Sequence, residues 1–340
     1  MKRICIFNTG GTIGMKPTPQ GLRPVKGFLA EQMKLMQELS DDLMPDFEIV
    51  EYDPVIDSAN MTPGHWQQIA QDIASRFAQF DGFVVLHGTD TMAYTSSALP
   101  FMMPNLSKPV VLTGSQLPLG QIRSDGRENL KTAMVIAANF SIPEVGLFFG
   151  EALYRGCRAT KISASRLDAF DSPNYLPLAA AETSIEVFEE RLRKVAQPAS
   201  TTLAIQEIRA TEIATFRLFP GMSTEVLKNV LHRPLKALIL ESYGVGNGPS
   251  LNRDFLATIA SASRDNIVIV NCTQCRHGCV LQHEYEVGRM LEDSGVVSGR
   301  DLTIEAAIAK LLYLFTNHSE VAEIRRLVLL NLVGELTEAH

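Results

Sequence analysis

Short apolar runs rich in β-branched residues recur along the chain, and stretches with a helical pattern separate them. A continuous apolar run bounded by glycine and polar residues predicts a strand that is buried on both faces. The expected strands are residues 3–8, 83–86, 109–113 and 144–149 in the first half, and 237–240 and 267–270 in the second. Strands that alternate with helices predict an α/β protein, with a larger N-terminal, mostly parallel sheet flanked by helices and a smaller C-terminal α/β domain.

Helix signals accompany these strands. Thr62 followed by Pro63 predicts a helix start, because threonine caps the first free N–H groups and proline at the first turn needs no hydrogen bond. Apolar residues then recur on one face of this helix, at Trp66, Ile69, Ala70, Ile73, Phe77 and Phe80. Residues 303–315 and 319–333 are expected to form the closing helices.

The chain divides at a charged stretch that ends in Gln-Pro-Ala-Ser. We expect an N-terminal catalytic domain over residues 1–188, a linker region over 189–210 and a C-terminal α/β domain over 211–340. In the first domain, glycine and polar residues follow three strands directly. Open α/β sheets bind their ligands at this end of the strands, so the loops at 9–14, 87–92 and 113–118 are candidates for a site.

Composition narrows the class of partner. A formal net charge of −7 offers no basic field, which argues against a nucleic-acid partner. No apolar stretch has the length of a membrane helix, and the apolar start of the chain is too short for a signal peptide, so we expect a cytoplasmic protein without a membrane partner. Five cysteines, an odd number, fit reduced thiols better than a disulfide framework.

The loop at residues 9–14, Thr-Gly-Gly-Thr-Ile-Gly, brings two hydroxyls to the end of the first strand. Its glycines let backbone N–H groups approach a ligand, although a plain tight turn explains the same residues. The loop lacks the dinucleotide pattern, and no phosphate-binding loop occurs in the chain, so a nucleotide cofactor is not expected.

Thr89 and Asp90 place a second hydroxyl beside a carboxylate in the loop at 87–92. Helix capping alone would account for this pair, but two hydroxyl loops at one end of a sheet favour a site. Lys161 is a third candidate. Most lysines are surface charges, whereas a lysine drawn into a crevice can serve as a base or proton relay.

These motifs resemble the bacterial L-asparaginase family. Thr-Gly-Gly-Thr-Ile-Gly, His-Gly-Thr-Asp-Thr-Met at 87–92, Thr-Gly-Ser-Gln-Leu-Pro at 113–118 and Arg-Ser-Asp-Gly at 123–126 follow the family's order. Tyr-Gly-Val-Gly-Asn at 243–247 and Asn-x-Thr-Gln-Cys at 271–275 are similar to its type I, cytoplasmic branch. The resemblance implies the two-domain asparaginase-like fold, hydrolysis of L-asparagine without cofactor or metal, and a homodimer or homotetramer.

The resemblance also implies roles for individual residues. Thr12 is the expected nucleophile, which forms an acyl-enzyme ester, and Thr89, Asp90 and Lys161 are the expected catalytic partners. Asp90 and Thr89 also contact the substrate, and the segment Asp57, Ser58 and Ala59 is expected to bind its α-carboxylate. Without the resemblance, an ordinary loop hydrogen bond would explain Ser58 equally well.

Two positions depart from the family pattern. Leu22 stands where members commonly carry a tyrosine that orients the nucleophile, so another hydroxyl replaces it or turnover is lower. Glu241 stands where type I members often carry an arginine that binds an effector asparagine, and an acidic group would repel the effector's carboxylate. The remaining residues expected in this effector pocket are Asn247, Thr273 and Cys275.

Other interpretations stay open at this level. Cys272, Cys275, His277 and Cys279 are close enough in sequence to suggest zinc, although structural zinc usually joins two separated ligand pairs, and we expect reduced thiols. A broader glutaminase-asparaginase differs from an asparaginase by the discrimination of one methylene, which motifs do not reveal. The asparaginase-like subunit of a tRNA-dependent amidotransferase would carry an additional N-terminal domain, and only eight residues precede the first motif. An amino-acid sensor would retain the pocket without turnover.

Overall fold

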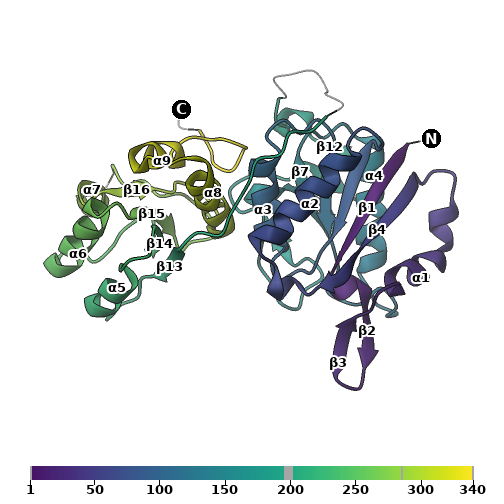
Figure 1. The fold of residues 1–340 in the computed structure, drawn as a ribbon, viewed down its shortest axis with the longest axis horizontal. Coiled ribbons are helices and arrows are strands. Elements are labelled where there is room, and N and C mark those ends of the chain that lie inside the picture. The colour runs from purple at the N-terminus through teal and green to yellow at the C-terminus, as the bar shows by residue number, and fades with distance from the viewer. Residues whose placement is uncertain (1, 195–201, 285, 339–340) are drawn as a thin grey trace. The chain divides into compact units, whose positions relative to one another are not determined.

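The computed structural model describes residues 2–194, 202–284 and 286–338 (Figure 1). Contacts between residues divide the chain into two units, Met1–Gln206 and Glu207–His340. Of the linker region expected at 189–210, residues 195–201 lie outside the described part of the chain. Among the described residues, no helix has both the length and the apolar character that a membrane span requires.

The first unit is built on an eight-stranded sheet with the order β12-β11-β8-β7-β6-β5-β1-β4. Five neighbouring strands run parallel: β4 (Asp46–Ile56), β1 (Arg3–Gly10), β5 (Gly82–Leu86), β6 (Val110–Thr113) and β7 (Val145–Phe149). Three short strands continue the sheet in antiparallel fashion: β8 (Ala152–Arg155), β11 (Ala179–Ala181) and β12 (Ile185–Val187). The sheet is therefore mostly parallel, as the sequence predicts.

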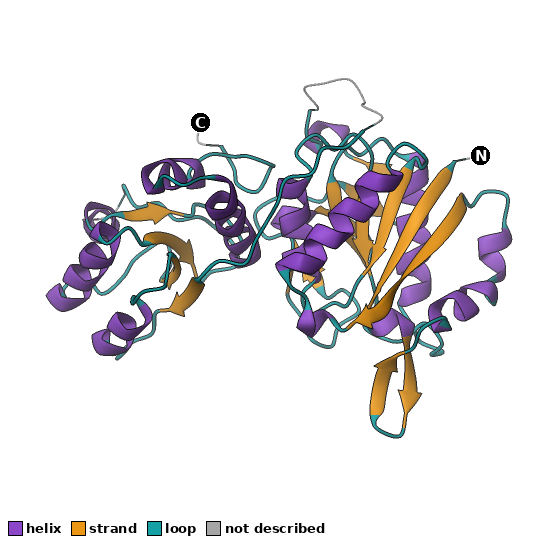
Figure 2. Ribbon diagram, in the orientation of Figure 1, coloured by secondary structure: helices purple, strands orange, loops and turns teal. Residues whose placement is uncertain are grey.

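Helices cover both faces of this sheet (Figures 1 and 2). One face packs against α1 (Phe28–Lys34) and α4 (Gly126–Asn139), where Ile4, Val84 and Val111 share a core with Leu130 and Met134. The opposite face packs under α2 (Pro63–Arg76) and α3 (Met92–Met102). Two small hairpins complete the unit, β2 (Met15–Thr18) with β3 (Gly21–Pro24), and β9 (Thr160–Lys161) with β10 (Phe170–Asp171).

The second unit is a four-stranded parallel sheet in the order β13-β14-β15-β16. Its strands are β13 (Ile213–Arg217), β14 (Ala237–Ser242), β15 (Val268–Thr273) and β16 (Val296–Ser298). One face packs against α5 (Thr224–Val230), α6 (Arg253–Arg264) and α7 (Glu286–Asp293). The other face packs against α8 (Ile304–Asn317) and α9 (Val321–Val328), so each face has its own apolar core.

All six expected strands are present, with ends that differ from the predictions by a few residues. Thr62 caps α2, Pro63 opens it, and the expected apolar face is buried. The helix expected at 319–333 is shorter than predicted, because α9 ends at Val328. Beyond it the chain turns around two buried charges: Lys310 donates to the carbonyl oxygens of Val328 and Leu330, and Glu335 accepts from two backbone N–H groups.

Candidate active site

The loops that follow β1, β4, β5 and β6 meet at the carboxyl edge of the first sheet. Gly11 has φ 93°, and a Cβ atom there would lie 2.4 Å from the backbone nitrogen of Gly88. A Cβ atom on Gly88 would in turn lie 2.4 Å from the hydroxyl oxygen of Ser58. The loops after β1 and β5 are thus in backbone contact, and the loop after β4 closes on both, because these positions carry no side chain.

Thr12 lies in this junction, on the short 3₁₀ turn Thr12–Gly14 that follows Gly11. Its side chain is half-buried. Within the described chain, neither the hydroxyl nor the backbone N–H of Thr12 donates to another protein atom. A hydroxyl left without a protein partner, on a loop held by glycine contacts, is available to a bound molecule.

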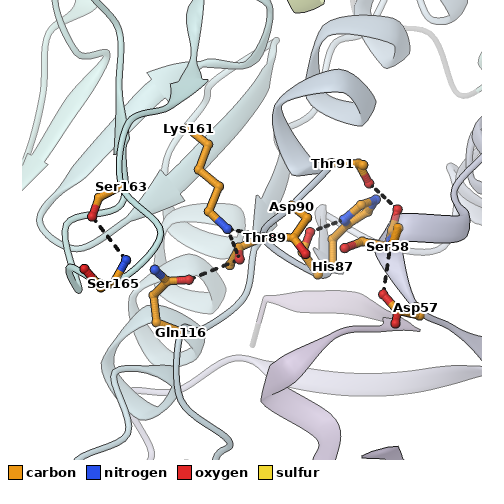
Figure 3. Close-up of polar contacts among 12 residues, drawn as sticks. Asp57, Ser58, His87, Thr89, Asp90, Thr91, Gln116, Lys161, Ser163 and Ser165 are labelled. Carbon is orange, nitrogen blue, oxygen red and sulfur yellow. Dashed lines mark hydrogen bonds and ion pairs between the residues drawn. The ribbon is translucent and has the colours of Figure 1, made fainter. Parts of the chain in front are cut away.

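Thr89, Asp90 and Lys161 form one hydrogen-bonded group (Figure 3). The Lys161 ammonium donates to the Thr89 hydroxyl over 2.8 Å and to the Asp90 carboxylate over 2.7 Å. Thr89 is buried, whereas the Asp90 side chain is 69% exposed. The structure therefore brings together three of the predicted residues, with the carboxylate facing outward and the hydroxyl enclosed.

Gln116, in the loop after β6, also contacts the Thr89 hydroxyl. Thr89 Oγ1 donates to Gln116 Oε1 over 3.1 Å (Figure 3). Gln116 Nε2 donates to the carbonyl oxygen of Arg166 over 3.1 Å. No role was predicted for this side chain from the sequence, although it lies in the motif at residues 113–118. The available signal was its position directly past a predicted strand, where polar residues gather.

Asp57, Ser58 and Ala59 form the loop after β4. The Asp57 carboxylate accepts from the Ala59 backbone N–H over 3.1 Å and so caps the 3₁₀ turn Ser58–Asn60. Thr91 donates its hydroxyl proton to the Ser58 carbonyl oxygen over 2.7 Å, which ties this loop to the one that carries Thr89. Ser58 is buried against Gly88. The three predicted substrate-binding residues thus lie beside the Thr89 loop (Figure 3).

The His87 side chain stabilises the loop that carries Thr89. Its ring is fully buried, and burial lowers its pKa to about 4, so the imidazole is neutral at pH 7. Because the Gly88 carbonyl oxygen can only accept, Nδ1 carries the proton of the 2.7 Å contact between them. Nε2 must then accept from the Thr95 hydroxyl, which itself accepts from the Trp66 indole N–H. Three side chains thereby fix the peptide group that precedes Thr89.

Family models match both units of the chain. A family model described as "Asparaginase, N-terminal" matches residues 3–193, and one described as "Glutaminase/Asparaginase C-terminal domain" matches residues 212–328. The chain belongs to the asparaginase family.

Individual relatives extend over the whole chain. L-asparaginase 1 of Escherichia coli K12 is 48% identical over 337 residues, which cover 99% of this chain and 98% of that protein. The crystal structure of L-asparaginase I from Vibrio cholerae superimposes with a TM-score of 0.91 at 45% identity and covers 99% of both chains. The thermostable L-asparaginase from Thermococcus kodakarensis gives a TM-score of 0.89 at 32% identity, over the full length of both chains. The two-domain asparaginase fold expected from the motifs is thus confirmed.

Two further positions stand out against the family pattern. Leu22 lies on β3, opposite Pro17, and is 45% exposed. Glu241 lies on β14 of the second unit, between the buried Leu240 and Ser242, and its carboxylate accepts from the Arg217 guanidinium over 3.0 Å. The charge that departs from the family pattern at Glu241 is therefore paired within its own unit.

The other residues expected in the effector pocket surround the loop after β14. The Thr273 hydroxyl donates to the Gly244 carbonyl oxygen and accepts from the Cys275 backbone N–H. The Asn247 backbone pairs with Tyr243 across the same loop. Thr273, Cys275 and Asn247 thus lie in one loop cluster at the carboxyl edge of the second sheet.

The cysteines among Cys272, Cys275, His277 and Cys279, the residues that suggested zinc, differ in burial. Cys272 is buried in the apolar core under α8 and α9, where burial raises its pKa to about 12, whereas Cys275 is exposed. Among the described residues, no group of three or more histidine, cysteine and acidic side chains is arranged to hold a metal ion. A thiol that retains its proton is a poor metal ligand, and Cys272 faces away from solvent.

Proposed function

We propose that this protein hydrolyses the side-chain amide of L-asparagine to L-aspartate and ammonia, with Thr12 as the nucleophile. The observation that carries this proposal is the Thr89–Lys161–Asp90 group, which is hydrogen-bonded at one end of the sheet beside a loop whose own threonine hydroxyl has no protein partner among the described residues. Full-length similarity to proteins named L-asparaginase supports the substrate. The chemistry needs neither a metal nor a cofactor.

In the first step, Thr12 Oγ1 attacks the side-chain carbonyl carbon of asparagine, and its proton passes to the Thr89–Lys161 pair. Backbone N–H groups around Gly11 and Thr89 are the proposed donors to the oxyanion, since within the described residues the Thr89 N–H donates to no protein atom. The C–N bond breaks as the nitrogen takes up a proton, and ammonia leaves an ester on Thr12. Water then attacks the ester, and aspartate and the free hydroxyl are released.

Two sets of residues at the edge of the site are proposed to bind the α-carboxylate and the ammonium group of asparagine. We assign its α-carboxylate to the segment Asp57–Ala59, where the buried Ser58 hydroxyl adjoins the glycine junction. Its ammonium group is assigned to the exposed Asp90 carboxylate. This arrangement would place the side-chain amide between the loops of Thr12 and Thr89.

The test is ammonia release across a concentration series of asparagine and, separately, glutamine. We expect turnover of asparagine, and a kcat lower by about 10³-fold or more in Thr12→Ala and Thr89→Val. Thr215→Val, an exposed threonine on β13, is the matched control and should retain wild-type rates. Discrimination against glutamine rests on one methylene, a difference of about 1–3 kcal/mol, so the ratio of kcat/KM values separates an asparaginase from a broader glutaminase-asparaginase.

Binding of asparagine without turnover would contradict the proposal and indicate a sensor built on the same fold. Full activity of either threonine variant would reject the assignment of that residue. The same series examines regulation: an effector site at Glu241, Asn247, Thr273 and Cys275 stays a prediction, and it requires a sigmoidal rate curve.

We further propose a cytoplasmic homo-oligomer, a dimer or a tetramer. The type I motifs and the similarity to L-asparaginase 1 over the full chain support this assignment. Light scattering at enzyme concentrations used for the assays gives the stoichiometry.

A further inference from the structure

We propose that Gln116 is a positioning residue for the reaction, which orients the Thr89 hydroxyl toward its proton-transfer role with Lys161. The inference rests on the proposed function, because it assigns Thr89 and Lys161 their parts in it. Gln116 lies in the loop after β6 and contacts Thr89 from the side opposite the Asp90 carboxylate (Figure 3).

The direction of each hydrogen bond follows from the groups involved. The Lys161 ammonium has only donors, so Thr89 Oγ1 accepts its proton over 2.8 Å. The Arg166 carbonyl oxygen has no proton to give, so the amide nitrogen of Gln116 faces it over 3.1 Å. The amide oxygen is therefore the end that faces Thr89, and the hydroxyl proton of Thr89 points at Gln116.

This geometry gives the Thr89 proton two alternative acceptors. With Lys161 protonated, the proton rests on the Thr89–Gln116 bond. When Lys161 is a neutral amine, its lone pair accepts that proton, and Thr89 Oγ1 is then able to take the proton of Thr12 during attack. The transfers balance: Lys161 gains one proton, Thr89 passes one on, and Thr12 loses one. Gln116 takes no proton itself: its amide oxygen accepts from the Thr89 hydroxyl before the transfer, and can accept again when Oγ1 holds the proton taken from Thr12.

Gln116 is itself held firmly, which a positioning role requires. Its backbone N–H and that of Leu117 both donate to the Asp125 carboxylate, over 2.9–3.1 Å. The segment that contains Arg166, the partner of the Gln116 amide nitrogen, is held by its own hydrogen bonds. The Ala169 carbonyl oxygen accepts from two backbone N–H groups, and the Ser163 hydroxyl accepts from the Arg166 backbone N–H. Gln116 thus connects the loop of Thr89 to the segment that directly follows Lys161, and so fixes the two catalytic groups relative to each other.

The experiment compares Gln116→Met with wild type in steady-state hydrolysis of asparagine. Methionine keeps the length and volume of the side chain and removes both hydrogen bonds. We expect kcat to fall about fivefold, the factor that corresponds to one neutral hydrogen bond of about 1 kcal/mol, with KM within twofold of wild type. Ser124→Ala is the control, because Ser124 Oγ stabilises the same loop through Leu117 and Gly126 without contacting Thr89.

A second background distinguishes positioning from simple support of the loop. In Thr89→Ser, the hydroxyl loses the γ-methyl group that restricts its rotamer, so its direction depends more on Gln116. We expect the kcat penalty of Gln116→Met to be at least threefold larger in the Thr89→Ser background than in wild type. Equal penalties in both backgrounds, a kcat within twofold of wild type, or a loss matched by Ser124→Ala would overturn the inference. Wild-type protein without asparaginase activity would instead reject the proposed function.

Discussion

His87 shows how one fully buried side chain stabilises the loop that carries Thr89. Its neutral imidazole donates through Nδ1 to the Gly88 carbonyl oxygen and accepts at Nε2 from Thr95. Burial lowers the pKa of this histidine from 6.5 to about 4. The charged form is disfavoured because the imidazolium would lose its hydration in the buried site.

This residue predicts an acid-dependent loss of stability. Below pH 6.5 the unfolded chain binds a proton at His87 that the folded chain refuses until about pH 4, so the contribution is complete above pH 6.5 and lost as the pH falls to 4. The shift corresponds to about 3 kcal/mol of the free energy of unfolding. The free energy of unfolding, measured with urea between pH 4 and 7, should depend less steeply on pH in His87→Gln than in wild type. His232→Gln, at an exposed histidine, should keep the wild-type slope, and parallel curves for wild type and His87→Gln would contradict the assignment.

At the scale of an element, the site depends on how closely two strand-end loops approach. The loops after β1 and β5 touch through Gly11 and Gly88, and the loop after β4 closes on Gly88 through Ser58. Parallel pairing of β4, β1 and β5 brings their carboxyl ends to one edge. Thr12 and Thr89 are therefore positioned by backbone contact between loops as much as by their own side chains.

Gly11→Ala is expected to impair catalysis strongly. A methyl group there would lie 2.4 Å from the Gly88 nitrogen at a φ of 93°, so the loop of Thr12 must shift away from that of Thr89. A displacement of about 1 Å corresponds to a loss of about 10²-fold in kcat/KM, and the backbone strain costs about 1–3 kcal/mol of stability. Gly14→Ala is the matched control in the same loop, because its nearest neighbour would be the Leu29 side chain at 3.8 Å. Similar kinetics and unfolding curves for the two variants would argue against the close approach.

At the scale of the whole molecule, each unit contains an ion pair whose two side chains are both buried. In the first unit Glu144 accepts from Arg155 over 2.6 Å, with both side chains buried. In the second unit Lys310 and Glu335 lie 2.7 Å apart, with exposed fractions of 1% and 0%. Lys310 and Glu335 also bind backbone groups that follow α9, which is why the chain leaves the helix there instead of continuing it.

Removing one member of the buried Lys310–Glu335 pair should reveal the free-energy cost of burying the charge of the other member. Lys310→Met leaves the Glu335 carboxylate buried without its counter-ion, and we expect a loss of about 3–5 kcal/mol in the free energy of unfolding. Lys310→Met combined with Glu335→Gln should recover part of this loss, since glutamine retains an acceptor for the backbone N–H groups. Lys236→Met, which breaks the exposed pair with Glu212, should change urea unfolding by about 1 kcal/mol at most. A Lys310→Met variant as stable as this control would show that the buried pair contributes little.

The sequence alone determined those features that depend on local pattern. Apolar runs marked the central strands because residues buried on both faces of a sheet must all be apolar, and Thr62 with Pro63 marked a helix start through local backbone chemistry. Motif order identified the family and the candidate residues Thr12, Thr89 and Lys161. The antiparallel strands β8, β11 and β12 carry no comparable signal, since they are short and lie toward the sheet edge.

Tertiary structure decided which of these residues meet. Residues 72 apart in sequence, Thr89 and Lys161, bond directly, and Gln116 joins them through a carbonyl of the following segment. The early end of α9 likewise depends on Lys310 and Glu335, whose pairing no local pattern encodes. The physical reason is common to both cases: periodicity reports whether a position is buried, whereas the direction of a hydrogen bond depends on groups that only folding brings within 3 Å.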